Sequence, residues 1–293
     1  MPLPAHSSRR CPVCHTPIAS NRAHCPRCAR ILDRARTSLP VALLIAALVE
    51  AYDSTIDAFR CYYSGAILDT DHPRHPFYLV FDHTDPGGDR IVACARFVNE
   101  MKKDLLESEF RIVVPAISDH MELGIPFDPN CIGFVKWKRA PVPISAGRAP
   151  LRRIPSGCHV CLGERIKRSW YCARCRRLVR GGCHGNKIRE AALIDSLDQA
   201  RNGFVCHYTH ILLDDRAQKR PCSVSFDHRV PGKPELVACA YFVNCMKTNL
   251  TDTEFRAVLR GLTNHWRLGT PFDIGVIDAA RYSGEAGRRR PAS

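Results

Sequence analysis

The stretch "FDHTDPGGDRIVACARFVNEMK", residues 81–102, is the most informative part of this chain. It returns 145 positions later as "FDHRVPGKPELVACAYFVNCMK", residues 226–247. The loop in the middle differs between the two stretches, whereas an Asp-His pair before it and an Asn after it are the same. This repeat indicates a tandem duplication, and the unchanged polar residues are the first candidates for function.

The similarity extends in both directions, to paired cysteines upstream and to a closing "GIPFD" or "GTPFD" downstream. We therefore predict two copies joined by a linker rich in proline and arginine and flanked by a disordered start and a basic tail. The predicted ranges are 1–10 for the start, 11–137 for copy 1 with its core at 61–128, 138–157 for the linker, 158–280 for copy 2 with its core at 206–273, and 281–293 for the tail.

The sequences of the two copies predict the same order of helices and strands, which is that of an α+β fold. A cysteine knuckle is followed by a helix (40–59 or 186–202), by strands (61–69, 76–83 and 90–97 in copy 1) and by a helical end. Pro115 is expected to break the helix predicted over 99–121. Thr251 and Glu254 have the spacing of a capping box, which favours two shorter helices in this region.

Eight of the 16 cysteines form two sets with one spacing, CxxC, ten residues, CxxC. Two such pairs place four sulfurs around one ion, and four protein ligands leave no open position on zinc. This predicts two structural zinc sites, with a redox pair as the weaker alternative. Their ligands are Cys11, Cys14, Cys25 and Cys28 in copy 1, and Cys158, Cys161, Cys172 and Cys175 in copy 2.

Composition indicates a partner of negative charge. The 293 residues carry a net charge of +14, which favours nucleic acid over an anionic membrane. The longest apolar run, 41–49, is shorter than a membrane span, and the start lacks the apolar segment of a signal peptide. We therefore expect a cytoplasmic protein without membrane segments, and the sequence leaves its oligomeric state open.

A strongly basic run follows the first cysteine pair of copy 2. Residues 164–190 contain nine Lys or Arg and two acids. We expect Arg174, Arg176 and Arg177 to contact phosphates. Trp170 and Tyr171 could stack on exposed bases, but packing beneath the zinc site is the favoured prediction for both.

The Asp-His-Asn set suits metal-assisted hydrolysis of phosphodiesters. A hairpin followed by a helix can bring Asp82, His83 and Asn99 together, and likewise Asp227, His228 and Asn244. Carboxylate and amide oxygens are hard ligands for a divalent cation, and neutral His accepts a proton near pH 7. Lys102 and Lys247, three residues after each Asn, could hold a phosphate. The structural alternative is that Asp-His fixes a turn and that Asn caps a helix.

The pattern DHxxPG…C…NxxK resembles the ββα-metal core of HNH, or His-Me finger, endonucleases, and phage recombination endonuclease VII-type proteins with accessory CxxC pairs in particular. The resemblance implies His83 and His228 as general bases, and Asp82, Asn99, Asp227 and Asn244 as ligands of Mg²⁺ or Mn²⁺. The His-to-Asn spacing is shorter than usual in that family, and no second cysteine adjoins the Asn.

The favoured prediction is therefore a metal-dependent endonuclease that acts on DNA, with copy 1 favoured as the active one because of its Gly-rich loop "DPGGDR". The main alternative is an inactive zinc-ribbon nucleic-acid-binding protein, and a third is a protein-interaction module. Other shared residues are expected to be structural. They are the thiols Cys61, Cys206, Cys94 and Cys239, and the packed or capping His120 and His265.

Overall fold

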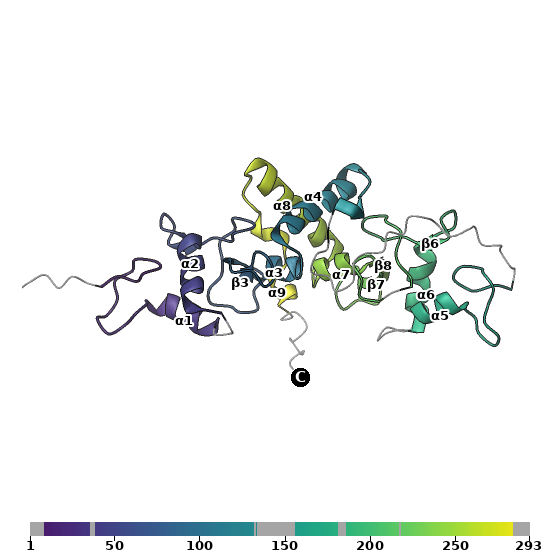
Figure 1. The fold of residues 1–293 in the computed structure, drawn as a ribbon, viewed down its shortest axis with the longest axis horizontal. Helices are drawn as coiled ribbons and strands as arrows, with labels where there is room; N and C mark the ends of the chain where they lie inside the picture. Colours follow the sequence, from purple (N-terminus) through teal and green to yellow (C-terminus); the bar gives the residue numbers. More distant parts are fainter. Residues whose placement is uncertain are drawn as a thin grey trace, which may run out of the picture. The chain divides into compact units, whose positions relative to one another are not determined.

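A computed structural model describes residues 9–35, 39–131, 133, 156–180, 186–216 and 218–283 of the chain. The predicted linker and both predicted terminal segments lie almost entirely outside the described residues. The described chain is a mixture of helices and two-stranded sheets, so the α+β prediction is confirmed (Figure 1).

Each set of four cysteines combines a turn with the start of a helix. In the first set the leading pair lies in a turn closed by the Arg10↔Pro17 bridge, and the second pair begins α1 (Pro26–Arg34). In the second set, the second cysteine pair likewise lies at the start of α5 (Ala173–Arg180). Neither helix was predicted. Cys25 caps α1 and Pro26 occupies its first turn, where the missing N–H of proline has no cost.

The two cysteine sets with their turns and helices, residues 11–34 and 158–180, are called the first and second zinc modules. The helix after each zinc module is shorter than predicted. α2 (Val41–Ala51) ends in a hairpin of β1 (Tyr52–Asp53) and β2 (Ala58–Phe59). α6 (Asn186–Asp195) ends in β5 (Leu197–Asp198) and β6 (Gly203–Phe204). Asp53 stops the first helix, because its carboxylate accepts from the Thr55 backbone N–H at 3.0 Å and so stabilises a turn.

Two longer hairpins carry the Asp-His pairs. β3 (Leu79–His83) pairs with β4 (Ile91–Ala95), with His83 opposite Ile91. β7 (Val224–His228) pairs with β8 (Leu236–Ala240), with His228 opposite Leu236. α2 packs on β4, and α6 packs on β8. The strand predicted over 61–69 is wrong: the backbone turns at Gly65, whose φ of +66° suits glycine, and only isolated bridges form there.

The helical ends form two helices per copy, as the capping-box spacing indicates. α3 (Arg96–Lys102) precedes α4 (Glu107–Leu123), and α7 (Tyr241–Lys247) precedes α8 (Asp252–Leu268). The Thr251 N–H donates to the Glu254 carboxylate at 2.7 Å, which confirms that capping box. Pro115 does not break its helix. It lies inside α4, and the break comes earlier, where Lys103 has a φ of 48°.

The short elements η1 (Pro129–Cys131), η2 (Ile274–Val276) and α9 (Ala279–Tyr282) complete the described chain. The chain forms two compact units, and their bounds differ from those of the sequence copies. One unit holds residues up to Glu100 together with those from Asn264 onward, and the other holds Met101–Thr263.

Each unit contains the closing Pro-Phe-Asp segment of the other sequence copy. In the first unit, the Phe272 ring stacks on Phe97 with centroids 5.6 Å apart. In the second, Phe127 stacks on Phe242 at 5.9 Å. The Trp266 indole also donates to the Tyr63 carbonyl at 2.6 Å within the first unit. The two closing segments therefore make matching ring contacts, each within one of the two units.

Candidate metal centres and the buried Asp–Lys cluster

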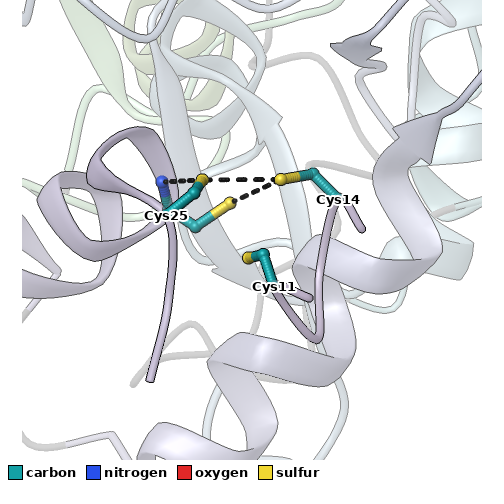
Figure 2. Close-up of side chains that lie close together, drawn as sticks. Cys11, Cys14 and Cys25 are labelled. Atoms are coloured by element: carbon teal, nitrogen blue, oxygen red, sulfur yellow. Dashed lines mark hydrogen bonds between the residues drawn. The ribbon is translucent and has the colours of Figure 1, made fainter. Parts of the chain in front are cut away.

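Both predicted sets of cysteines form compact clusters. In each set the four sulfurs lie within 4.8 Å of one another. In the first, Cys14 Sγ lies 3.4 Å from Cys25 Sγ and 3.7 Å from Cys28 Sγ, and Figure 2 shows the side chains of Cys11, Cys14 and Cys25 pointing toward one centre. In the second, the sulfurs of Cys161 and Cys172 are 3.7 Å apart.

These separations fit zinc. Four sulfurs at about 2.3 Å from a tetrahedral ion lie roughly 3.8 Å from one another. Backbone N–H groups support the sulfurs from outside, since Cys28 N lies 3.4 Å from Cys25 Sγ and Cys175 N lies 3.4 Å from Cys172 Sγ. The two clusters can hold two zinc ions, and four thiolates around each ion make these sites structural.

Protons compete with metal at the first cluster. Burial raises the pKa of Cys14, but hydrogen bonds with Thr16 and with the neighbouring Cys25 and Cys11 outweigh it and leave the pKa at about 6. Burial and the neighbouring Cys25 raise the pKa of Cys28. Metal binding must therefore release a proton from at least one thiol, so metal affinity is expected to rise with pH.

The two cysteine pairs of each set lie in different local structures. The leading pair of each set lies in a turn, whereas the second pair lies at the start of a helix. The eight predicted ligands are the residues that make up the two clusters.

A second kind of polar cluster surrounds Asp227 in copy 2. The Lys247 ammonium lies 2.8 Å from the Asp227 carboxylate and 3.4 Å from Asp252, and its side chain has no exposed surface. It also donates to the His228 carbonyl at 2.6 Å. The Tyr208 hydroxyl lies 2.5 Å from Asp227 and 2.8 Å from Asp252. One ammonium and one phenol thus serve two carboxylates in the interior.

The electrostatics of the two carboxylates differ. Burial raises the pKa of Asp227, and Lys247 opposes that shift. Burial would also raise the pKa of Asp252, but hydrogen bonds from His207, Tyr208 and Arg229 lower it well below its usual range. Burial next to these two carboxylates raises the pKa of Tyr208. Every member of this cluster therefore depends on the charge of its neighbours.

The two histidines predicted as general bases make the same kind of hydrogen bond in both copies. His83 Nδ1 donates to the Gly88 carbonyl at 2.7 Å, and His228 Nδ1 donates to the Lys233 carbonyl. Each bond joins a strand end to the loop that follows it. In the neutral ring, this bond fixes the proton on Nδ1 and makes Nε2 the basic nitrogen.

The predicted Asn ligands lie on the helices that follow the hairpins. Asn244 donates to the Ser225 hydroxyl at 2.8 Å and to the Phe226 carbonyl at 3.4 Å, so its amide braces α7 against β7. Asn99 lies half-buried in α3. Asp82 is buried, and its carboxylate accepts from the Tyr63 hydroxyl at 2.6 Å.

The residues predicted to contact phosphate are largely engaged within the protein. Lys102 and Lys247 are fully buried. Arg174 forms an ion pair with Asp215 and stacks over the Phe204 ring at 4.5 Å. Arg177 donates to the Asp215 carbonyl at 2.5 Å but keeps an exposed surface, and Arg176 is exposed.

The prediction that both aromatics pack beneath the zinc module is wrong for Trp170, which is 63% exposed. Tyr171 is half-buried, and its hydroxyl donates to Glu190 at 2.9 Å. The Trp belongs to a loop in which most of the other side chains are polar, so little apolar surface is at hand to cover it.

The structural predictions for the other shared residues are confirmed. Cys61, Cys94, Cys206 and Cys239 are buried thiols. His120 and His265 cap their helices, since the Nδ1 of each donates to a backbone carbonyl five residues ahead.

Sequence reasoning missed the tyrosines at 63 and 208 and the carboxylate at 252. A signal for the tyrosines was present, because both copies have Tyr at the same offset of 145. A weaker signal marks Asp252, since copy 1 has another carboxylate, Glu107, at the matching position.

No helix within the described part of the chain is both long enough and apolar enough to cross a membrane. Comparisons with protein-family models, with curated proteins and with solved structures find no match to this chain.

Proposed function

We propose that the chain is a nucleic-acid-binding protein made of two duplicated copies, each with a structural zinc module and a hairpin–helix core derived from a ββα-metal fold. The observation that carries this proposal is the place of Lys247. Its ammonium binds the carboxylate of Asp227, the carboxylate of Asp252 and a backbone carbonyl, a set of oxygens that would suit a cation.

A lysine in that place keeps the core together without an added ion. A divalent ion at Asp227 would have to displace a fully buried ammonium and leave it unpaired, which is costly. This favours a core that supports binding over one that hydrolyses phosphodiesters, at least in copy 2.

Nucleic acid is the partner that the charge supports. The net charge of +14 attracts a polyanion at long range. Close contact would come from exposed cations around the second zinc module, such as Lys167, Arg168 and Arg176. The partner is DNA in the favoured form of the proposal.

The test is the salt dependence of binding to labelled duplex and single-stranded DNA. Phosphate contacts release counterions, so affinity is expected to fall steeply, by a factor of about ten or more between roughly 50 and 200 mM salt for several contacts. Arg176→Glu should lower both the affinity and the slope. Binding that ignores salt would overturn the proposal and favour a protein-interaction module.

A second candidate function is the metal-dependent endonuclease, which the imidazole geometry favours. Both His83 and His228 are fixed with Nε2 as the basic nitrogen, as a general base needs. Mg²⁺ or Mn²⁺ at Asp82 and Asn99, or at Asp227 and Asn244, would stabilise charge on the phosphate. Copy 1 is the better candidate, since its loop is the Gly-rich one.

A further inference from the structure

The loop between the two cysteine pairs of the second zinc module forms a shallow basic groove. Residues 164–170 line it together with Ser156 and Gly157, and its volume is about 530 Å³, within the roughly 300–1,000 Å³ of small-ligand sites. The loop closes on itself through backbone bonds from Ile166 N to Tyr171 O at 3.1 Å and from Ser169 N to Ile166 O at 3.0 Å. The groove therefore has a defined backbone.

An exposed indole forms one wall of this groove. Trp170 is 63% exposed although the His159 ring lies 4.9 Å from it and the Arg165 guanidinium lies 5.6 Å from its centroid. The His159 N–H donates to the Trp170 carbonyl at 3.0 Å and so ties the Trp to the zinc turn. The ring is thus held in place while much of its surface remains in water.

The charges beside the indole are mostly positive. Lys167 and Arg168 are exposed, Arg165 is half-buried, and Glu164 is the one acid among the lining residues. A guanidinium that stacks on an aromatic ring keeps its N–H edge available for a phosphate. Cations around a fixed aromatic ring form the combination that binds unpaired nucleotides.

The first zinc module provides an internal control. At the matching positions, 147 residues earlier, it has Ile18, Ser20, Asn21 and Ala23 in place of the Arg, Lys, Arg and Trp. The cysteine spacing is the same in both modules, so zinc binding does not require the basic and aromatic side chains of the second loop.

We infer that the loop of residues 164–170 is a binding site for single-stranded nucleic acid, with an unpaired base stacked on Trp170 and the adjoining phosphates held by Arg165, Lys167 and Arg168. This inference rests on the proposed nucleic-acid binding and assigns it a site and a strand preference. Duplex DNA fits the groove less well, because its bases are already stacked on each other.

The experiment uses the full chain with His83→Ala and His228→Ala, so that cleavage cannot remove the probe, and no divalent ion is added. Binding to fluorescein-labelled oligo-dT, oligo-U and a duplex of matched length is measured by anisotropy. Trp170→Ala should weaken oligo-dT and oligo-U binding about tenfold, as expected for one lost stacking contact. Trp170→Phe should retain most of the affinity, and Arg22→Ala in the first loop should have no effect. The zinc content of each variant confirms that the module is intact.

The outcomes separate this inference from the proposed function. If the parent binds but Trp170→Ala binds equally well, the site is wrong while nucleic-acid binding stands. If the parent binds none of the three probes, both fail. If poly-glutamate displaces oligo-dT as well as unlabelled oligo-dT does, the loop is a general anion surface and base stacking is wrong.

Discussion

The protein contains two kinds of buried cluster, and each neutralises the negative charge of its side chains in a different way. The four-cysteine clusters bring several sulfurs together and need an ion from outside to hold them. The cluster around Asp227 brings carboxylates together and supplies its own cation, Lys247. The first kind ties folding to metal supply, and the second ties it to an internal ion pair.

The contrast separates two ways of neutralising buried anionic groups. An ammonium on a nearby helix can take the place of a divalent ion among oxygen ligands, but not among thiolates, because lysine is a point charge that suits hard oxygen acceptors. Variants of both kinds of cluster can test how far this distinction holds.

The largest effect is expected from loss of a zinc ligand. Cys14→Ser should remove one of two zinc ions per chain and unfold the first zinc module, because zinc contributes about 10 kcal/mol or more to such modules. Elemental analysis and thermal unfolding check this. Cys131→Ser, at an exposed thiol outside both clusters, is the matched control and should keep both ions.

Removing the internal cation should also be costly, but without any effect on bound metal. Lys247→Met leaves the buried Asp227 carboxylate without a positive charge beside it, and should lower the free energy of unfolding by about 3–5 kcal/mol. Denaturant titration measures this, with Lys233→Met as the exposed control. A loss below about 1 kcal/mol would show that the pair does not hold the core.

An assay for endonuclease activity tests whether the Asp-His-Asn sets also work with a metal ion. If a divalent ion works at Asp82 or Asp227, DNA should be nicked in Mg²⁺ or Mn²⁺, and His83→Ala with His228→Ala should slow cleavage about 10²–10⁴-fold while binding persists. Gel assays on duplex, branched and single-stranded DNA measure this. Unchanged cutting by the double variant would exclude both histidines.

The smallest effect concerns pH. Because Tyr208 has a raised pKa in the folded state, the folded protein keeps this proton after the unfolded chain has lost it above about pH 10. Stability should therefore fall as pH rises beyond that point. Tyr208→Phe should lower stability at pH 7 by about 1–3 kcal/mol, yet flatten the alkaline slope. Parallel curves for parent and variant would contradict this.

The clearest success of sequence reasoning is the set of zinc ligands, because cysteine spacing is a local property. The division of each helical end into two helices was also predictable, since the Thr251–Glu254 capping box spans only four residues. The prediction for Pro115 failed because the identity of a proline alone does not show whether the helix ends there or continues through it, as α4 does.

Contacts between residues far apart in the sequence could not be predicted. Nothing near Lys247 in the sequence indicates that it lies beside Tyr208, since the two are brought together by folding across the hairpin. The ion pair of Arg174 with Asp215 likewise joins residues that are far apart in the sequence, so the arginine could not be distinguished from its exposed neighbour Arg176. The exposure of Trp170 could not be predicted either, because it depends on whether other side chains fold over the indole.

The packing of the closing segments has a consequence for each half of the chain when it is produced alone. Because Phe272 stacks on Phe97 and Phe127 stacks on Phe242, a single copy cut out at the linker would lack the aromatic ring that completes its interior. Two such fragments could supply each other's missing ring, so residues 11–137 alone should associate in pairs.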